Sequence, residues 1–140
     1  METRRTPELS LRETFLRAAA GLPGEDERAA VVGEALDYLQ RGFDAHYAGG
    51  GASDDDVLVG DNAYALAVET IARLDEPRFV AVASRMIRDG AGRIAEGGTV
   101  TIEMWTPHLS GLLDVISEEG TEKSEARIRQ AAEDLRDQGG

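Results

Sequence analysis

Apolar residues recur three and four positions apart along most of the chain, which is the spacing of one face of an α-helix. The pattern is clearest in the segment that opens at Pro77, and segments that start near residues 9, 25 and 54 show it too. Stretches that contain Gly or Pro separate these segments and predict the ends of helices. We therefore predict an all-α fold, a single-domain bundle of about five or six helices.

The segment between residues 98 and 105 leaves a choice between strand and helix. Apolar residues alternate there as in a strand, but a lone strand finds no pairing partner in this chain. Thr106 and Pro107 are expected to begin a further helix, because Pro favours the first helical position. Residues 121–140 are mostly polar, so we expect a polar C-terminal helix or tail beside a helical bundle of residues 1–120.

The segment from Asp54 to Leu74 is apolar on most of its helical circumference. A helix of this kind is buried at the centre of a bundle or lies at an interface. We therefore expect this helix to contact either the rest of the chain or another subunit. The interface candidates are Leu58, Tyr64, Leu66, Val68 and Ile71.

The composition limits the kinds of partner. The 140 residues carry a formal net charge of −12, which opposes binding to nucleic acid and to anionic lipid. No apolar run approaches the roughly 20 residues of a membrane span, and the first residues lack the apolar segment of a secretory signal. We therefore expect no membrane span and a cytoplasmic location. The chain contains no cysteine, which excludes disulfides and thiolate chemistry.

The basic residues are fourteen arginines and a single lysine, Lys123. An acidic chain poor in lysine resembles, in composition, the proteins of a salt-loving (halophilic) cytoplasm, although a GC-rich genome would also favour arginine. Molar salt shortens the Debye length to about 3 Å and screens the repulsion between acidic groups. We therefore expect the fold to be more stable in molar KCl than in dilute buffer.

The three consecutive aspartates from Asp54 to Asp56 are the first candidates for metal ligands. Adjacent helical residues point about 100° apart, so three in a row cannot converge on one ion. Ser53 instead fits an N-cap, with Asp56 at the third position of a capping box, and acids suit the positive end of a helix dipole. This interpretation is favoured over the alternative, an enzyme that uses Asp54, Asp61 and Glu69 with Mg²⁺.

Asp61 follows Gly60 inside the apolar helix, where an unpaired buried carboxylate would be costly. We expect Arg85 or Arg88 of the next helix to pair with it, and we favour this pairing over a ligand role. Gly60 would allow close packing of another helix.

The chain has two histidines. His46 and Asp44 supply only two ligands, whereas zinc sites use three or four. His108 follows Pro107 and is expected to be an exposed residue in the first turn of its helix. The residues thus predict no catalytic group, no metal ligand and no cofactor.

One stretch, VLVGDNAYALAVETIARL, resembles a helix of the trans-isoprenyl diphosphate (polyprenyl) synthases that carries Leu-x-Gly-Asp before a run rich in Ala and Leu. Gly60 and Asp61 are its most specific matches. Upstream, QRGFDAHY is similar to the Arg-Arg-Gly…His segment of that family, with Arg41, Gly42 and His46 at the matching positions.

The resemblance covers roughly residues 25 to 120 and implies a helical fold. The family's enzymes hold diphosphate through Mg²⁺ on an Asp-Asp-x-x-Asp motif, but the corresponding stretch here, AVVGEALDYL, has only Glu34 and Asp37 as acids. The second aspartate-rich motif of the family is missing as well. The resemblance therefore implies a short, non-catalytic relative, similar to the small subunits that act through a catalytic partner.

Two functions follow as hypotheses. The first is an accessory or degenerate polyprenyl-synthase-like protein of isoprenoid biosynthesis, which acts through helix-mediated association with a catalytic prenyl synthase subunit. The alternative is a small acidic helical interaction protein unrelated to isoprenoid metabolism. Such a protein would form a homo-oligomer through the helices expected at 54–74 and 77–95. Neither hypothesis requires a cofactor, and Mg²⁺ enters only under the enzyme alternative.

Overall fold

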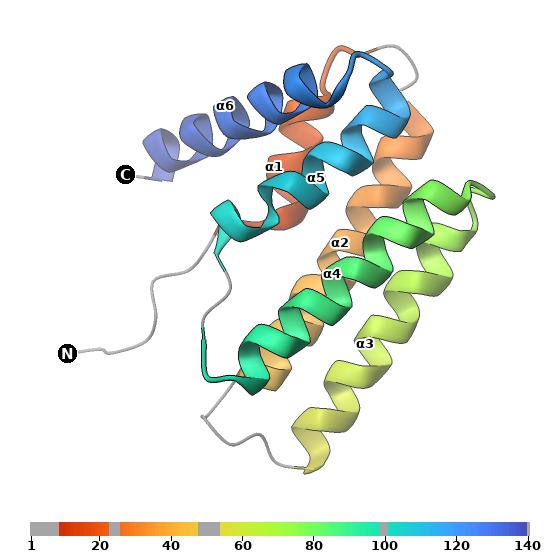
Figure 1. The fold of residues 1–140 in the computed structure, drawn as a ribbon, viewed down its shortest axis with the longest axis vertical. Helices are drawn as coiled ribbons and strands as arrows, with labels where there is room; N and C mark the ends of the chain where they lie inside the picture. Colours follow the sequence, from red (N-terminus) through yellow and green to blue (C-terminus); the bar gives the residue numbers. More distant parts are fainter. Residues whose placement is uncertain (1–8, 23–25, 48–53, 99–100, 140) are drawn as a thin grey trace.

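The computed structural model describes residues 9–22, 26–47, 54–98 and 101–139, which contain six α-helices and no strand (Figure 1). The prediction of an all-α, single-domain bundle of five or six helices is confirmed for this part of the chain. The helices are α1 (Leu11–Ala19), α2 (Asp26–Tyr47), α3 (Asp54–Ala72), α4 (Pro77–Ala95), α5 (Ile102–Ser117) and α6 (Thr121–Gly139).

Helix α2 is the centre of the bundle, because it contacts α1, α3, α4 and α5. Helices α3 and α4 form a hairpin, and α4 and α5 pass in front of α2 and α1 in the view of Figure 1. Helix α6 packs on α5 and α1. None of the described helices combines the length and the apolarity that a membrane span requires.

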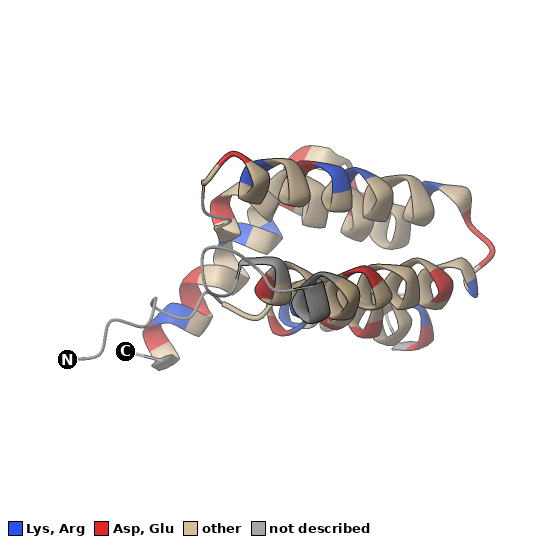
Figure 2. Cartoon of the chain, turned by 90° about the horizontal axis from the view of Figure 1, so that it is seen from below, with Lys and Arg blue, Asp and Glu red and all other residues tan. Residues whose placement is uncertain are grey.

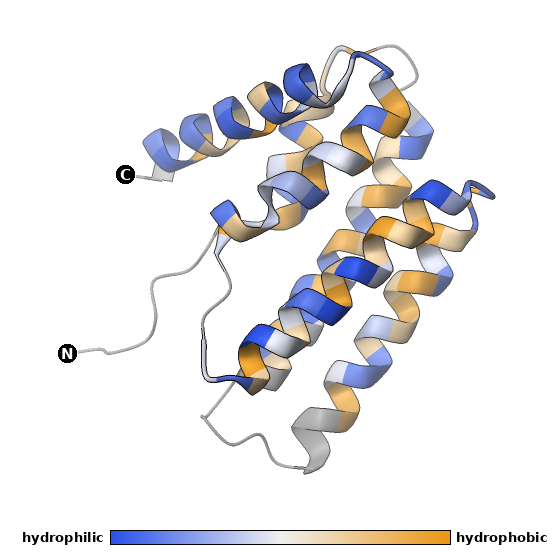
Figure 3. Ribbon diagram, in the orientation of Figure 1, coloured by the Kyte–Doolittle hydropathy of each residue, from blue (hydrophilic) through white to orange (hydrophobic). Residues whose placement is uncertain are grey.

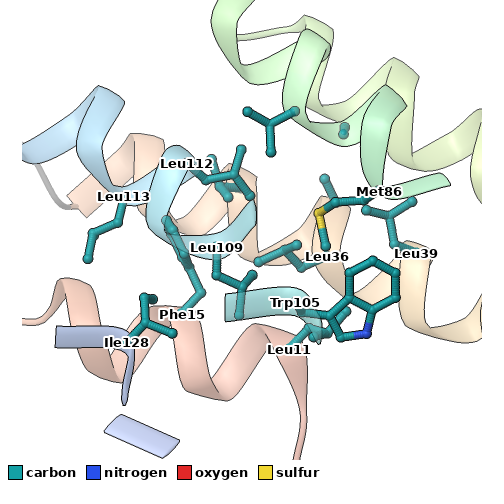
Figure 4. Packing of buried hydrophobic residues seen from close by; sticks show 14 of the residues in the cluster. Leu11, Phe15, Leu36, Leu39, Met86, Trp105, Leu109, Leu112, Leu113 and Ile128 are labelled. Atoms are coloured by element: carbon teal, nitrogen blue, oxygen red, sulfur yellow. The ribbon is translucent and has the colours of Figure 1, made fainter. Parts of the chain in front are cut away.

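The core lies where the apolar sides of all six described helices meet, and α3 contributes Ile71 to it. Figure 3 shows that hydrophobic residues follow one side of most helices, and Figure 4 shows how their side chains converge. Burying a large apolar side chain stabilises a fold by about 1.5–3 kcal/mol, so this cluster outweighs the intrinsic preference of any one helix. Fully buried members, one from each of α1, α2, α4, α5 and α6, are Phe15, Leu36, Met86, Leu109 and Ile128.

The start of α1 is held by two side chains. Ser10 is the N-cap, and its Oγ accepts a hydrogen bond from the backbone N–H of Glu13 at 3.0 Å. The side chain of Gln40 on α2 also binds the backbone at the start of α1. Its Oε1 accepts from the N–H of Leu11 at 2.8 Å, and its Nε2 donates to the carbonyl of Leu9 at 3.3 Å.

The start of α5 corrects the sequence prediction. The helix begins at Ile102 and not at Thr106 or Pro107, because Thr101 is the N-cap and its Oγ1 accepts from the N–H of Met104 at 3.3 Å. Pro107 therefore lies inside the helix, where it removes one backbone donor. The apolar alternation belongs to a helix from residue 102 onward, so the strand alternative is wrong there; residues 99 and 100 lie outside the described part.

Helix α6 is continuous to Gly139, and its middle part is docked on the bundle. Its Ile128 is fully buried, with Ala131 and Ala132 beside it in the core. Arg136 donates to a carboxylate oxygen of Glu103 on α5 at 2.6 Å. The mostly polar segment 121–140 thus forms a helix in the described part, and its few apolar residues attach it to the bundle.

Helix α3 lies at the edge of the bundle and not at its centre. It packs on α2 and α4, and its opposite side is exposed. The expectation of a centrally buried helix is therefore wrong, because only one side of α3 has intramolecular neighbours. The interface alternative stays a prediction.

Candidate functional site

The two glycines of the family-like motif meet where α2 and α3 cross. Gly42 and Gly60 are both buried. A Cβ atom added to Gly42 would lie 2.4 Å from Cε1 of Tyr64 and 3.2 Å from the carbonyl oxygen of Gly60. Only a hydrogen atom fits in this space, so the two backbones approach closely, as expected for Gly60.

The charged members of the same motif face outward. Arg41 is exposed, and its Nη2 bonds to Oδ2 of Asp37 at 3.0 Å, one turn earlier on α2. Asp61 is exposed as well. The expectation that Asp61 is buried, and therefore needs Arg85 or Arg88 as an ion-pair partner, is wrong. An ion pair of Asp61 on the surface would contribute about 0–1 kcal/mol to stability.

Several candidate ligands lie outside the described residues. These are the side chains of His46 and of the three aspartates from Asp54 to Asp56, and Ser53, the predicted N-cap, lies outside them too. The backbone of α3 does begin at Asp54, in agreement with the predicted helix start. Among the described side chains, no group of three or more His, Asp or Glu can hold a metal ion. The enzyme alternative thus gains no support from the described part.

Two of the interface candidates are part of the chain's own core. Tyr64 is 8% exposed and Ile71 is 1% exposed. Burial, with a smaller contribution from the nearby carboxylate of Asp61, raises the pKa of the Tyr64 phenol. Leu66 and Val68 are half-buried. Only the outward side of α3 is therefore available to a partner.

The outward side of α3 begins with two adjacent large apolar residues. Leu58 is 66% exposed and Val59 is 58% exposed. Asn62 and Ala65, one and two turns further along, are exposed too. Leu58 was among the predicted interface residues. Val59 was not, because the apolar run around it is nearly continuous and does not indicate which residues are exposed. We call Leu58 and Val59 the α3 patch.

His108 corrects a second prediction. Because α5 begins at Ile102, His108 lies in the second turn, where its side chain is only 15% exposed. Its Nε2 lies 3.0 Å from Oδ2 of Asp89 on α4, and its ring lies 5.8 Å from that of Trp105. Burial lowers the pKa of the imidazole, although Asp89 acts in the opposite direction. His108 is thus a neutral link between α4 and α5 at pH 7.

Aromatic packing joins α2, α3 and α5 beneath α4. The rings of Phe43 and Trp105 stack at 4.8 Å, and Tyr64 lies 5.4 Å from Phe43. Gly90 of α4 makes room for this stack, since a Cβ there would lie 2.4 Å from Phe43 and 2.8 Å from Trp105. The aromatic residues near the two glycines therefore serve to pack the helices together. The residues that a partner could contact lie on the outward side of α3.

Comparison of the chain with protein-family models, with curated proteins and with solved structures finds no match in any of the three. The functional argument therefore rests on the chain's own residues. Packing within the described part of the chain does not explain why the two large apolar residues of the α3 patch are exposed.

Proposed function

We propose that this chain acts by helix-mediated association with another polypeptide, and that the α3 patch is the centre of the contact. One observation carries the proposal. Leu58 and Val59 are the large apolar side chains that are mainly exposed in the described part of the chain, and they are adjacent on one helix. Single exposed apolar residues are common on protein surfaces, whereas two large ones in succession on one exposed turn are a feature that a binding partner would cover.

The energy available from the α3 patch is sufficient for a specific contact. Full burial of a Leu or Val side chain is worth about 1.5–3 kcal/mol, and more than half of each of these side chains is exposed. Covering both would therefore contribute about 2–3 kcal/mol. This is about a thirtyfold to hundredfold change in affinity.

A narrower version of the proposal is an accessory or degenerate polyprenyl-synthase-like subunit with a catalytic synthase as its partner. Support for it comes from the resemblance around Gly60 and Asp61. It also comes from the contact of Gly42 with Gly60, which joins the two segments of the motif. In this version the outward side of α3 would bind the catalytic subunit.

The alternative is a helical interaction protein unrelated to isoprenoid metabolism. The charged members of the motif favour it, because Arg41 bonds to Asp37 on the surface and Asp61 is exposed, so neither side chain is enclosed in a binding pocket. Both versions use the same contact residues and differ in the identity of the partner.

A capture experiment tests the proposal and separates its two versions. Tagged protein is used to recover partners from its native cells, beside the double variant Leu58→Ser, Val59→Ser and a control, Ala126→Ser, at an exposed position on α6. A recovered partner is then purified and its Kd is measured. We expect the double variant to bind about thirtyfold more weakly or worse, and the control to bind as the parent does.

An aspartate-rich prenyl synthase among the partners would support the narrower version. Partners of other kinds that depend on the α3 patch would support the alternative. Equal binding of the parent and the double variant to every purified partner would refute the proposal.

A further inference from the structure

The hairpin of α3 and α4 carries charges of opposite sign on its two helices. Helix α3 has five acidic residues and no basic one, a net charge of −5, whereas α4 has four arginines and one aspartate, a net charge of +3. Figure 2 shows acidic and basic residues distributed along the helices of the bundle. Since the chain as a whole carries −12, a basic helix beside an acidic one is a local departure from the overall balance.

The opposite charges lie at the same end of the hairpin. Asp61 and the three preceding aspartates belong to the first half of α3. Arg88 and Arg93 belong to the second half of α4, and Arg85 lies just before its midpoint. The turn between the helices makes them antiparallel, so the start of α3 and the end of α4 both lie at the lower end of the hairpin in Figure 1. All three of these arginines are exposed.

The outward sides of the two helices also differ in shape. On α3, Leu58 and Val59 protrude. On α4, the exposed residues between the arginines are small, and they include Ser84 and Gly92. A Cβ atom at Gly92 would have no other atom within 4 Å, so there is open space above this part of α4. A protruding apolar pair on one helix thus has an exposed stretch of small residues as its counterpart on the other.

We propose that a second copy of this chain covers the α3 patch, with α3 of each copy packed against α4 of the other. Pairing α3 with α3 would bring two acidic helices together, whereas pairing α3 with α4 brings opposite charges together twice and closes around a two-fold axis. The inference rests on the proposed function and adds the identity of the partner. Arg85 and Arg88 of one copy then lie near the acidic half of α3 of its partner.

Disulfide cross-linking between single-cysteine variants tests this arrangement, because the chain contains no cysteine of its own. The variants are Leu58→Cys, Gly92→Cys and, as a control at a distant exposed position, Ala126→Cys. A disulfide requires Cα atoms within roughly 7 Å, so its formation reports which residues meet. The experiment is done in about 0.15 M KCl, where a Debye length of about 8 Å weakens the long-range repulsion between two acidic copies but leaves charge pairs at the contact in force.

We expect a mixture of Leu58→Cys and Gly92→Cys to cross-link at least tenfold faster than either variant alone or than Leu58→Cys mixed with Ala126→Cys. The double variant Leu58→Ser, Val59→Ser should raise the dimer dissociation constant of the parent protein at least tenfold in analytical ultracentrifugation. Because both residues are exposed, circular dichroism should show an unchanged fold.

Preferential cross-linking of Leu58→Cys with itself would overturn the inference, and so would equal rates in all mixtures. A parent protein that stays monomeric at millimolar concentration would overturn it too. If such a monomer still binds a different polypeptide through the α3 patch, the proposed function stands and only the second copy as the partner is wrong.

Discussion

Replacing Gly42 by alanine adds one methyl group at the crossing of α2 and α3. Its carbon would lie 2.4 Å from Cε1 of Tyr64 and 3.2 Å from the carbonyl oxygen of Gly60. Tyr64 is buried and packs on Phe43, with ring centroids 5.4 Å apart, so the ring has little room to turn away. The methyl group must therefore displace the ring or separate the two helices.

The magnitude follows from two opposing effects. Overpacking of a tight core site costs about 1–3 kcal/mol. Alanine is better than glycine in a helix by about 0.5–1 kcal/mol, which offsets part of this cost. We therefore expect the Gly42→Ala variant to lose about 1–2 kcal/mol of unfolding free energy.

Gly92→Ala is the matched control, because it is the same change inside another helix where the added Cβ has no atom within 4 Å. Here only the helix preference acts, and we expect a gain of about 0.5–1 kcal/mol. Urea unfolding followed by circular dichroism measures both variants beside the parent. If Gly42→Ala proves as stable as Gly92→Ala, the close approach of α2 and α3 described here is incorrect.

Three further predictions concern the rest of the bundle. The lowered pKa of His108 means that the unfolded chain binds its proton more readily, so this residue should contribute stability above pH 6.5 that is lost as the pH falls below that value. Urea unfolding between pH 7.5 and 5.5 should show a smaller loss for His108→Gln than for the parent, and equal losses would contradict the assignment. Gln40→Ala should cost about 1–3 kcal/mol in the same assay at pH 7.5, because it leaves the N–H of Leu11 and the carbonyl of Leu9 without their bonds to Gln40. A cost below about 0.3 kcal/mol would show that water replaces Gln40 fully. The acidic composition predicts a higher Tm in 2 M KCl than in dilute buffer, and differential scanning calorimetry that gives equal values would disprove this expectation.

Helical periodicity was sufficient to predict the fold class, because amphipathic spacing and glycine-containing loops are local features of the sequence. It failed at α5, where Thr106 and Pro107 resemble a helix start. The N-cap is Thr101, five residues earlier than Thr106. It caps the helix through a single hydrogen bond, in which its Oγ1 accepts from the N–H of Met104. Pro107 lies in the second turn of the helix, where the N–H that it lacks would have bonded to the carbonyl of Glu103, so the buried side chains of α5 must offset this loss.

The candidate site was harder to predict, because exposure depends on packing between helices. The apolar run of α3 gives no sign of which side meets α2, so Tyr64 and Leu58 looked equivalent although one is buried and the other exposed. The exposure of His108 was also predicted wrongly, since it depends on a contact with Asp89 of another helix, 19 positions earlier in the sequence. Gly60 was the exception, because a glycine inside an apolar helix is itself a sign of close packing.

Cysteine accessibility at the α3 patch tests the association account most directly, whichever partner covers it. A Val59→Cys variant is labelled with a maleimide in dilute purified solution and in its native cells, with Ala126→Cys as the control. We predict that labelling of residue 59 in cells is at least tenfold slower, relative to the control, than in dilute solution. Equal relative rates in the two settings would show that Val59 stays uncovered, and would contradict association through α3.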